Sequence, residues 1–123
     1  MPTETDHERF ARTNMSSLEQ TDAESAAVQK TNNRVTLGSM VAKIANVEYI
    51  RPINLRHMTI CVITMQNGWA LVGKSAPADA ANFNDELGQK FAYEDALRQC
   101  WQLEGYLLRE RLHNQRDPDF DEV

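Results

Sequence analysis

The chain has 123 residues, of which 41% are hydrophobic, and a formal net charge of −5, so it is long enough for one small domain. Acidic residues outnumber basic ones at both ends, which leaves residues 34–113 nearly neutral. A nearly neutral body argues against a DNA-coating protein, which needs a concentrated basic face. No apolar run approaches the roughly 20 residues of a transmembrane helix, and no signal-peptide pattern opens the chain, so we expect no membrane partner.

The charge pattern divides the chain into three parts. Residues 1–33 are a polar N-terminal arm that we expect to be partly disordered, with the first fifteen residues mobile. Within this arm, Leu18–Lys30 favours a marginal helix with too few apolar positions to dock firmly. Residues 34–113 form a single α+β domain, and residues 114–123 are an acidic tail.

The domain begins with a short helix and a strand. Thr36 is a good N-cap for a helix from about Leu37 to Asn46, where apolar residues recur on one stripe. Val47–Arg51 then favours a strand, which Pro52 ends or limits to a sheet edge. The following loop, residues 53–57, carries Arg56 to the start of the next strand.

Asn67-Gly68 between two strand-like runs, Met58–Gln66 and Trp69–Ala76, indicates a hairpin with a type I′ turn. A two-residue turn places Gln66 opposite Trp69, and therefore Thr64 opposite Leu71, Val62 opposite Gly73 and Ile60 opposite Ser75. Both faces of this hairpin carry apolar residues, so both need cover. One cover is the chain's own helix; the other is a second element or a second subunit.

A long helix follows the loop at residues 76–81, with Asn82 as its expected N-cap. The predicted fold is therefore α+β: a small antiparallel sheet with an Asn-Gly hairpin packed against a long C-terminal helix, and a short helix before the sheet. The apolar stripe of the long helix exceeds what three strands can cover, so we expect a dimer or a larger homo-oligomer. Its expected seam is Leu87, Phe91, Ala96, Cys100, Leu103 and Leu107.

The sequence offers no recognisable catalytic set. Ser75, Thr59 and Cys61 are possible nucleophiles, but no base accompanies them in a known pattern. Cys61 and Cys100 form no CxxC motif and have no histidine at metal-ligand spacing, so we expect two buried, reduced thiols. We therefore predict that the protein is not an enzyme and has no metal and no cofactor.

A binding module for an aromatic, anionic ligand is the second hypothesis. Trp69 and Phe83 can stack on a nucleobase, the helix N-terminus at Asn82 suits a phosphate, and Arg56 and Arg109 supply forked positive charge. Alternatively, the aromatic residues belong to the core, Asn82 is a plain cap and the arginines are ordinary surface residues. A third hypothesis is a structural or regulatory protein that acts through protein–protein contacts.

Two segments, TICVITMQNGWALVGKSA and NFNDELGQKFAYEDALRQCWQLEGYLLRERL, resemble a family of small tailed-phage proteins. The shared pattern is Asn-Gly-aromatic, Gly-x-Ser-Ala, Asn-Phe and Trp-x-x-Glu-Gly-Tyr, and the resemblance covers about residues 34–112. The family includes Thoeris anti-defence proteins, which sequester cyclic ADP-ribose signals made by bacterial TIR proteins. The resemblance implies binding without cleavage in the host cytoplasm and a dimer-based hexamer, with cyclic oligonucleotides held at a separate site in some members.

The resemblance also implies roles for individual residues. Trp69 would stack on a base, Asp79 and the backbone before Asn82 would contact ribose or phosphate, and Arg56 and Arg109 would contact the phosphates. The chain departs from the family pattern at Trp69, where phenylalanine is common, and at Ala78-Asp79. The expected ligand-binding set is Trp69, Asp79, Asn82, Phe83, Arg56, Arg109 and Thr59.

Overall fold

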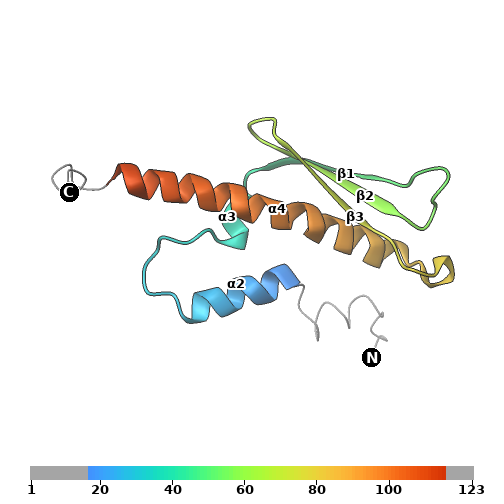
Figure 1. Ribbon diagram of the computed structural model, residues 1–123, viewed down its shortest axis with the longest axis horizontal. Helices are drawn as coiled ribbons and strands as arrows, with labels where there is room; N and C mark the ends of the chain where they lie inside the picture. The colour runs from blue at the N-terminus through green and yellow to red at the C-terminus, as the bar shows by residue number, and fades with distance from the viewer. Residues whose placement is uncertain (1–16, 116–123) are drawn as a thin grey trace, which may run out of the picture.

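The computed structural model describes residues 17–115. Its elements are α2 (Ser17–Ala27), α3 (Leu37–Val41), β1 (Ile44–Ile50), β2 (Thr59–Met65), β3 (Ala70–Ser75), the 3-10 turn η1 (Ala80–Asn82) and α4 (Asp85–Asn114). The strands form one antiparallel sheet in the order β1-β2-β3. Figure 1 shows the sheet beside the first half of α4, whose C-terminal half runs on past the strands. The predicted α+β architecture is confirmed.

Two parts of the sequence-based division fall outside these residues. The expected mobility of the first fifteen residues lies outside the described range, and so does nearly all of the acidic tail. The boundaries of the three predicted parts therefore stay predictions.

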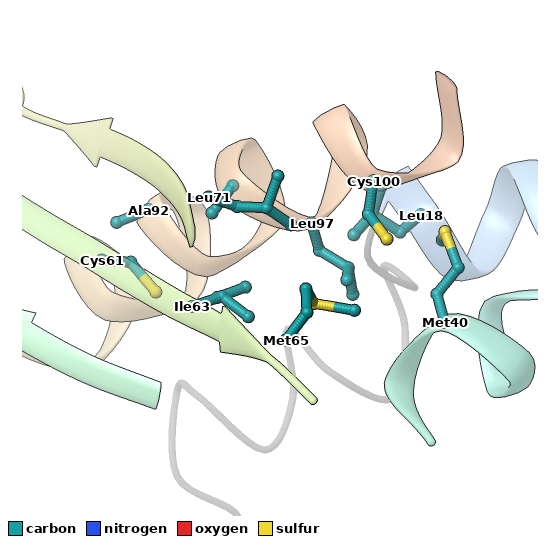
Figure 2. Packing of buried hydrophobic residues seen from close by; sticks show 10 residues of the cluster. Leu18, Met40, Cys61, Ile63, Met65, Leu71, Ala92, Leu97 and Cys100 are labelled. Atoms are coloured by element: carbon teal, nitrogen blue, oxygen red, sulfur yellow. The ribbon is translucent and has the colours of Figure 1, made fainter. Parts of the chain in front are cut away.

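The core lies between β2, β3 and α4. Alternate residues of β2 are buried, which places Thr59, Cys61, Ile63 and Met65 on the face toward the helix. Figure 2 shows Leu97 reaching toward Ile63 and Met65 in this layer, with Leu18 and Met40 near Cys100. Further members of the cluster are Leu71, Ala92 and Ala96.

The hairpin turn is not the type I′ turn that Asn67-Gly68 predicts. Met65 N donates to Trp69 O at 2.8 Å and Gly68 N donates to Met65 O at 2.9 Å, so the loop contains three residues. Among the described residues, a positive φ occurs at Gly68 alone, at +89°. Asn67 instead accepts a hydrogen bond from Trp69 N through its side chain, at 3.0 Å. This arrangement is a turn closed by a left-handed glycine, the usual three-residue hairpin loop.

The extra loop residue shifts the predicted register by one. Ile63 pairs with Leu71 and Cys61 with Gly73, whereas the sequence analysis placed Thr64 and Val62 there. A shift of one residue pairs each side chain of a strand with a residue that belonged to the opposite face of the sheet in the predicted register. Leu71 and Gly73 are therefore on the core face, and Val72 is on the open face of the sheet.

The helix at Thr36 is shorter than predicted. Thr36 caps α3 through a hydrogen bond from Ser39 N at 3.1 Å, as expected, but the helix ends at Val41 and not at Asn46. The hairpin explains the early end, because Gln66 donates its backbone N–H to Lys43 O at 2.9 Å and its side-chain amide to Ala42 O at 3.1 Å. Those carbonyls are thereby turned toward β2, and β1 starts three residues earlier than the predicted strand.

The long helix begins later than predicted, and its N-cap is Asn84. Asn84 Oδ1 accepts a hydrogen bond from Leu87 N at 3.0 Å, whereas Asn82 ends η1. The 3-10 turn has its own cap, Asp79, whose Oδ1 accepts from Ala81 N at 2.9 Å. Phe83 lies between the two turns in an extended conformation. The expected helix N-terminus at Asn82 is therefore two residues away from the true one.

The N-terminal helix α2 is better docked than its few apolar residues predict. Leu18 is buried in the core cluster, and Ser17 Oγ donates to Glu94 Oε2 at 3.2 Å while accepting from Arg98 at 2.6 Å. The Arg34 guanidinium contacts the Asp22 carboxylate at 2.7 Å and holds the pKa of that carboxyl below its usual value. Polar contacts thus help to hold α2 against the domain, whereas the sequence suggested only weak apolar docking.

Of the apolar seam predicted along α4, only Ala96 and Cys100 are buried, and no member past Cys100 is buried. Phe91, Leu103 and Leu107 are exposed, and Ala92 and Leu97 are buried in their place. A helix of 30 residues is about 45 Å long, whereas strands of six or seven residues reach about 20 to 24 Å. The sheet is therefore too short to cover the C-terminal part of the helix.

Two glycines in this fold should respond in opposite ways to alanine. A Cβ atom at Gly73 would overlap two backbone atoms of α4, Ala92 O and Ala96 N, so we expect Gly73→Ala to destabilise the protein by about 3 kcal/mol or more. Gly105 lies within α4 with nothing within 4 Å of its Cβ position, so Gly105→Ala should stabilise it by up to about 1 kcal/mol. Thermal unfolding of both variants tests this; equal effects would contradict the close approach of α4 to β3.

Candidate functional site

The structure separates the seven predicted ligand residues. Arg56, Thr59, Asp79, Asn82 and Phe83 belong to the end of the sheet where the β1–β2 loop and η1 lie. The other two, Trp69 at the hairpin turn and Arg109 in the part of α4 past the sheet, are at the opposite end (Figure 1). The six residues of β3 between the two ends span about 20 Å. A single chain therefore does not bring Trp69 and Arg56 to one small ligand.

We call Arg51, Arg56 and Phe83 the arginine cluster. Arg51 donates to the Arg56 carbonyl from Nε at 3.1 Å and from Nη2 at 2.7 Å, and Arg56 Nη1 donates to the Arg51 carbonyl at 2.9 Å. The Arg51 guanidinium lies over the Phe83 ring, 4.5 Å from its centre. These reciprocal bonds close the β1–β2 loop and hold two positive side chains next to each other. Sequence reasoning missed Arg51, although its place at a strand end five residues before Arg56 was a usable signal.

Phe83 and Thr59 both lie close to Gly88 in the first turns of α4. The Phe83 ring carries Arg51, so the face expected to stack on a base is occupied by a guanidinium. Thr59 is 1% exposed, and its hydroxyl lies close to Gly88, where a Cβ would be 2.7 Å away. Thr59 therefore forms part of the wall between β2 and α4 and is not at the surface, and its contact with a ligand stays a prediction.

Asp79 and Asn82 are exposed and lie on the η1 turn beside Phe83. One carboxylate oxygen of Asp79 already caps that turn. The first turn of α4 is occupied by its own acidic residues, Asp85 and Glu86, together with the Asn84 cap. The acidic first turn of α4 therefore offsets the positive end of the helix, whereas the two arginines add positive charge at this end of the sheet.

Trp69 lies at the other end, in a surface that we call the Trp69 groove. Trp69 is 58% exposed, which rules out the alternative that it is a core residue. The groove has a volume of about 540 Å³, within the range of small-molecule sites. Its rim carries an ion pair between Lys43 Nζ and Glu104 Oε2 at 2.6 Å, so Lys43 adds little net charge. The groove is lined by Lys43, Met65, Gln66, Asn67, Trp69, Cys100, Leu103, Glu104, Tyr106 and Leu107.

Both cysteines of the described residues are buried, and the pKa of each thiol is raised. Burial raises the pKa of the Cys61 thiol to about 11, against a smaller lowering by a hydrogen bond with Tyr49, and burial also raises the pKa of Cys100. No group of three or more His, Cys, Asp or Glu residues between positions 17 and 115 is placed to hold a metal ion. In the same range, no helix is long and apolar enough to cross a bilayer.

The two thiols should be inert in the folded protein. Both are buried, and the raised pKa of Cys61 leaves almost no thiolate at pH 8. We expect iodoacetamide at pH 8 to modify neither cysteine in the native protein and both in denaturant, as measured by intact mass. Fast native modification of Cys61 would contradict the packing between β2 and α4.

Most of the chain matches a known protein family. The model of a family described as phage protein (N4 Gp49/phage Sf6 gene 66) matches residues 35–112 of the chain. No curated protein and no solved structure matches it.

Proposed function

Since the chain belongs to the phage protein (N4 Gp49/phage Sf6 gene 66) family, we propose that it is an anti-defence protein that binds cyclic ADP-ribose-type immune signals and sequesters them without cleavage. Membership of this family makes the chain a phage protein. Its Asn-Gly hairpin and its Trp-x-x-Glu-Gly-Tyr motif resemble those of the anti-defence proteins, and this resemblance suggests the class of ligand. The site of action would be the host cytoplasm.

The arginine cluster is the observation that carries this proposal. Cyclic ADP-ribose has two phosphates and a purine, so it needs forked positive charge next to a flat surface. Arg56 uses one N–H group for the Arg51 carbonyl and has others for a phosphate, with which a guanidinium forms paired hydrogen bonds. The Arg51 guanidinium lies over the Phe83 ring, and a guanidinium plane is itself a stacking surface for a base.

Trp69 and Arg109 enter the proposal through a second copy of the chain. A compact cyclic nucleotide does not span the roughly 20 Å between the ends of β3. If Trp69 stacks on the same ligand that Arg56 binds, the two residues belong to different subunits of a dimer-based assembly, such as a hexamer. The Trp69 groove is also large enough to hold one base of a cyclic oligonucleotide, as a second binding site would require.

The direct experiment is depletion and recovery of the ligand. The protein is mixed with a cyclic ADP-ribose isomer, the free nucleotide is measured after filtration, and the retained fraction is heated and measured again. Depletion followed by release of intact nucleotide is the expected result, because a sequestering protein binds its ligand without converting it. A changed product would show an enzyme, and no depletion by a molar excess of protein would overturn the proposal.

Replacing Arg56 should weaken this binding. We expect Arg56→Ala to raise the Kd for the cyclic ADP-ribose isomer about 10- to 100-fold, since hydrogen bonds to charged groups contribute about 1.5–3 kcal/mol. The matched control is Arg111→Ala, an exposed arginine in the last turn of α4. Calorimetry that shows equal loss in both variants would mean that general charge, and not the arginine cluster, holds the ligand.

Replacing Trp69 tests the opposite end. We expect Trp69→Ala to abolish nucleotide depletion and Arg109→Ala to weaken it, with the fold and the assembly intact because both side chains are exposed. A lost base stack alone costs about 1–3 kcal/mol. Light scattering checks the assembly; its loss in Trp69→Ala would show that Trp69 contacts another subunit and not the nucleotide.

The alternative function, a regulatory protein that acts through protein contacts, is favoured by the exposed apolar residues of α4 past the sheet. Leu103, Tyr106 and Leu107 lie there beside Trp69. Thermal shift separates the two functions, because a bound nucleotide raises Tm with its concentration and a protein adaptor shows no such rise.

A further inference from the structure

The two edges of the sheet differ in whether side chains of α4 bond to their outward-pointing backbone groups. On β3, Lys74 N donates to Asp95 Oδ2 at 3.0 Å, and Val72 O accepts from Gln99 Nε2 at 2.8 Å. Both side chains come from α4. They occupy outward-pointing backbone groups of β3, so this edge is closed to another strand.

The β1 edge has no such cover. The bond from Met65 N to Trp69 O means that odd-numbered residues of β2 bond to β3, so the even-numbered ones bond to β1. Their partners are Asn46, Glu48 and Ile50. The backbone N–H and C=O groups of Val47 and Tyr49 therefore point away from the sheet, and no other element between residues 17 and 115 bonds to them.

We propose that β1 pairs with β1 of a second copy, antiparallel about a two-fold axis at Val47, to make a six-stranded sheet. Unpaired edge groups are a template for another strand. Centring the axis on Val47 uses all seven residues of β1 and places Asn46 opposite Glu48 of the partner subunit. Centring it on Glu48 would place two carboxylates opposite each other, which is destabilising.

The geometry favours a second copy over an unrelated peptide. The strand is complementary to itself at this register, with Val47 opposite Val47 of the partner subunit and amide opposite carboxylate on the open face. The β-bulge between Ile44 and Asn46 lies at the start of the strand, so the centre of the proposed pairing, residues 46–48, falls within Asn46–Ile50, which pairs regularly with β2.

Antiparallel pairing has a consequence for ligand binding. This consequence rests on the proposed function, whereas the pairing of the strands does not. The end of β1 next to Arg51 would lie beside the start of the partner subunit's β1. That start adjoins Lys43 on the rim of the Trp69 groove. The arginine cluster of one copy and the groove of the other would then lie on the same side of the dimer.

A pair of cysteines tests the register. Residues opposite each other at a non-hydrogen-bonded position of this new pair have Cα atoms about 4.5 Å apart, within reach of a disulfide. We expect the double variant N46C/E48C to form a covalent dimer on oxidation, seen on a non-reducing gel. The control V72C/K74C, on the closed β3 edge, should stay monomeric on the same gel. Equal cross-linking in both, or none in N46C/E48C, would overturn the proposal.

Proline at the outward position tests the backbone bonds. Val47→Pro removes an N–H that β2 does not use, whereas Val47→Ala keeps it and loses similar packing. Light scattering should show a dimer or a multiple of it for the wild type and Val47→Ala, and half that mass for Val47→Pro. A monomeric wild type, or a folded Val47→Pro of unchanged mass, would overturn the pairing; if Val47→Pro does not fold, the cysteine pair decides. Nucleotide depletion, measured separately, tests the proposed function and not the pairing.

Discussion

The close approach of α4 to the sheet is the constraint on which the other features depend. Gly73 has backbone atoms of Ala92 and Ala96 where a Cβ would be, so the helix lies directly against β3. At this distance, Asp95 and Gln99 can reach the backbone of β3, and Ile63, Leu71 and Leu97 fill the remaining space. The same contact fixes the direction of α4 and therefore how far its C-terminal half runs past the strands.

The fold class and the order of the elements followed from local patterns, whereas boundaries and register did not. Thr36 as a cap, the Asn-Gly hairpin and the long amphipathic helix were all readable, because each depends on residues close in sequence. The early end of α3 depends on Gln66, more than twenty residues away, which bonds to Ala42 and Lys43. The register depended on whether the loop has two or three residues, and a left-handed Gly68 fits either.

The candidate site was predictable by residue type more than by place. Arg56, Asp79, Asn82 and Phe83 lie at one end of the sheet, as a loop-to-helix junction implies. Trp69 follows a hairpin turn, so its distance from that junction could have been deduced from the length of β3. The burial of Thr59 beside Gly88 and the position of Arg51 over Phe83 are contacts between residues far apart in the sequence, which no local pattern encodes.

The closed edge of β3 also limits how large an assembly can become. A sheet with two open edges can add strands without end, which is the route to filaments. Here Asp95 and Gln99 occupy one edge, so a sheet joined through β1 ends in β3 on both sides. Growth by strand addition would stop at two copies, and any larger assembly has to use a different surface, such as the exposed end of α4.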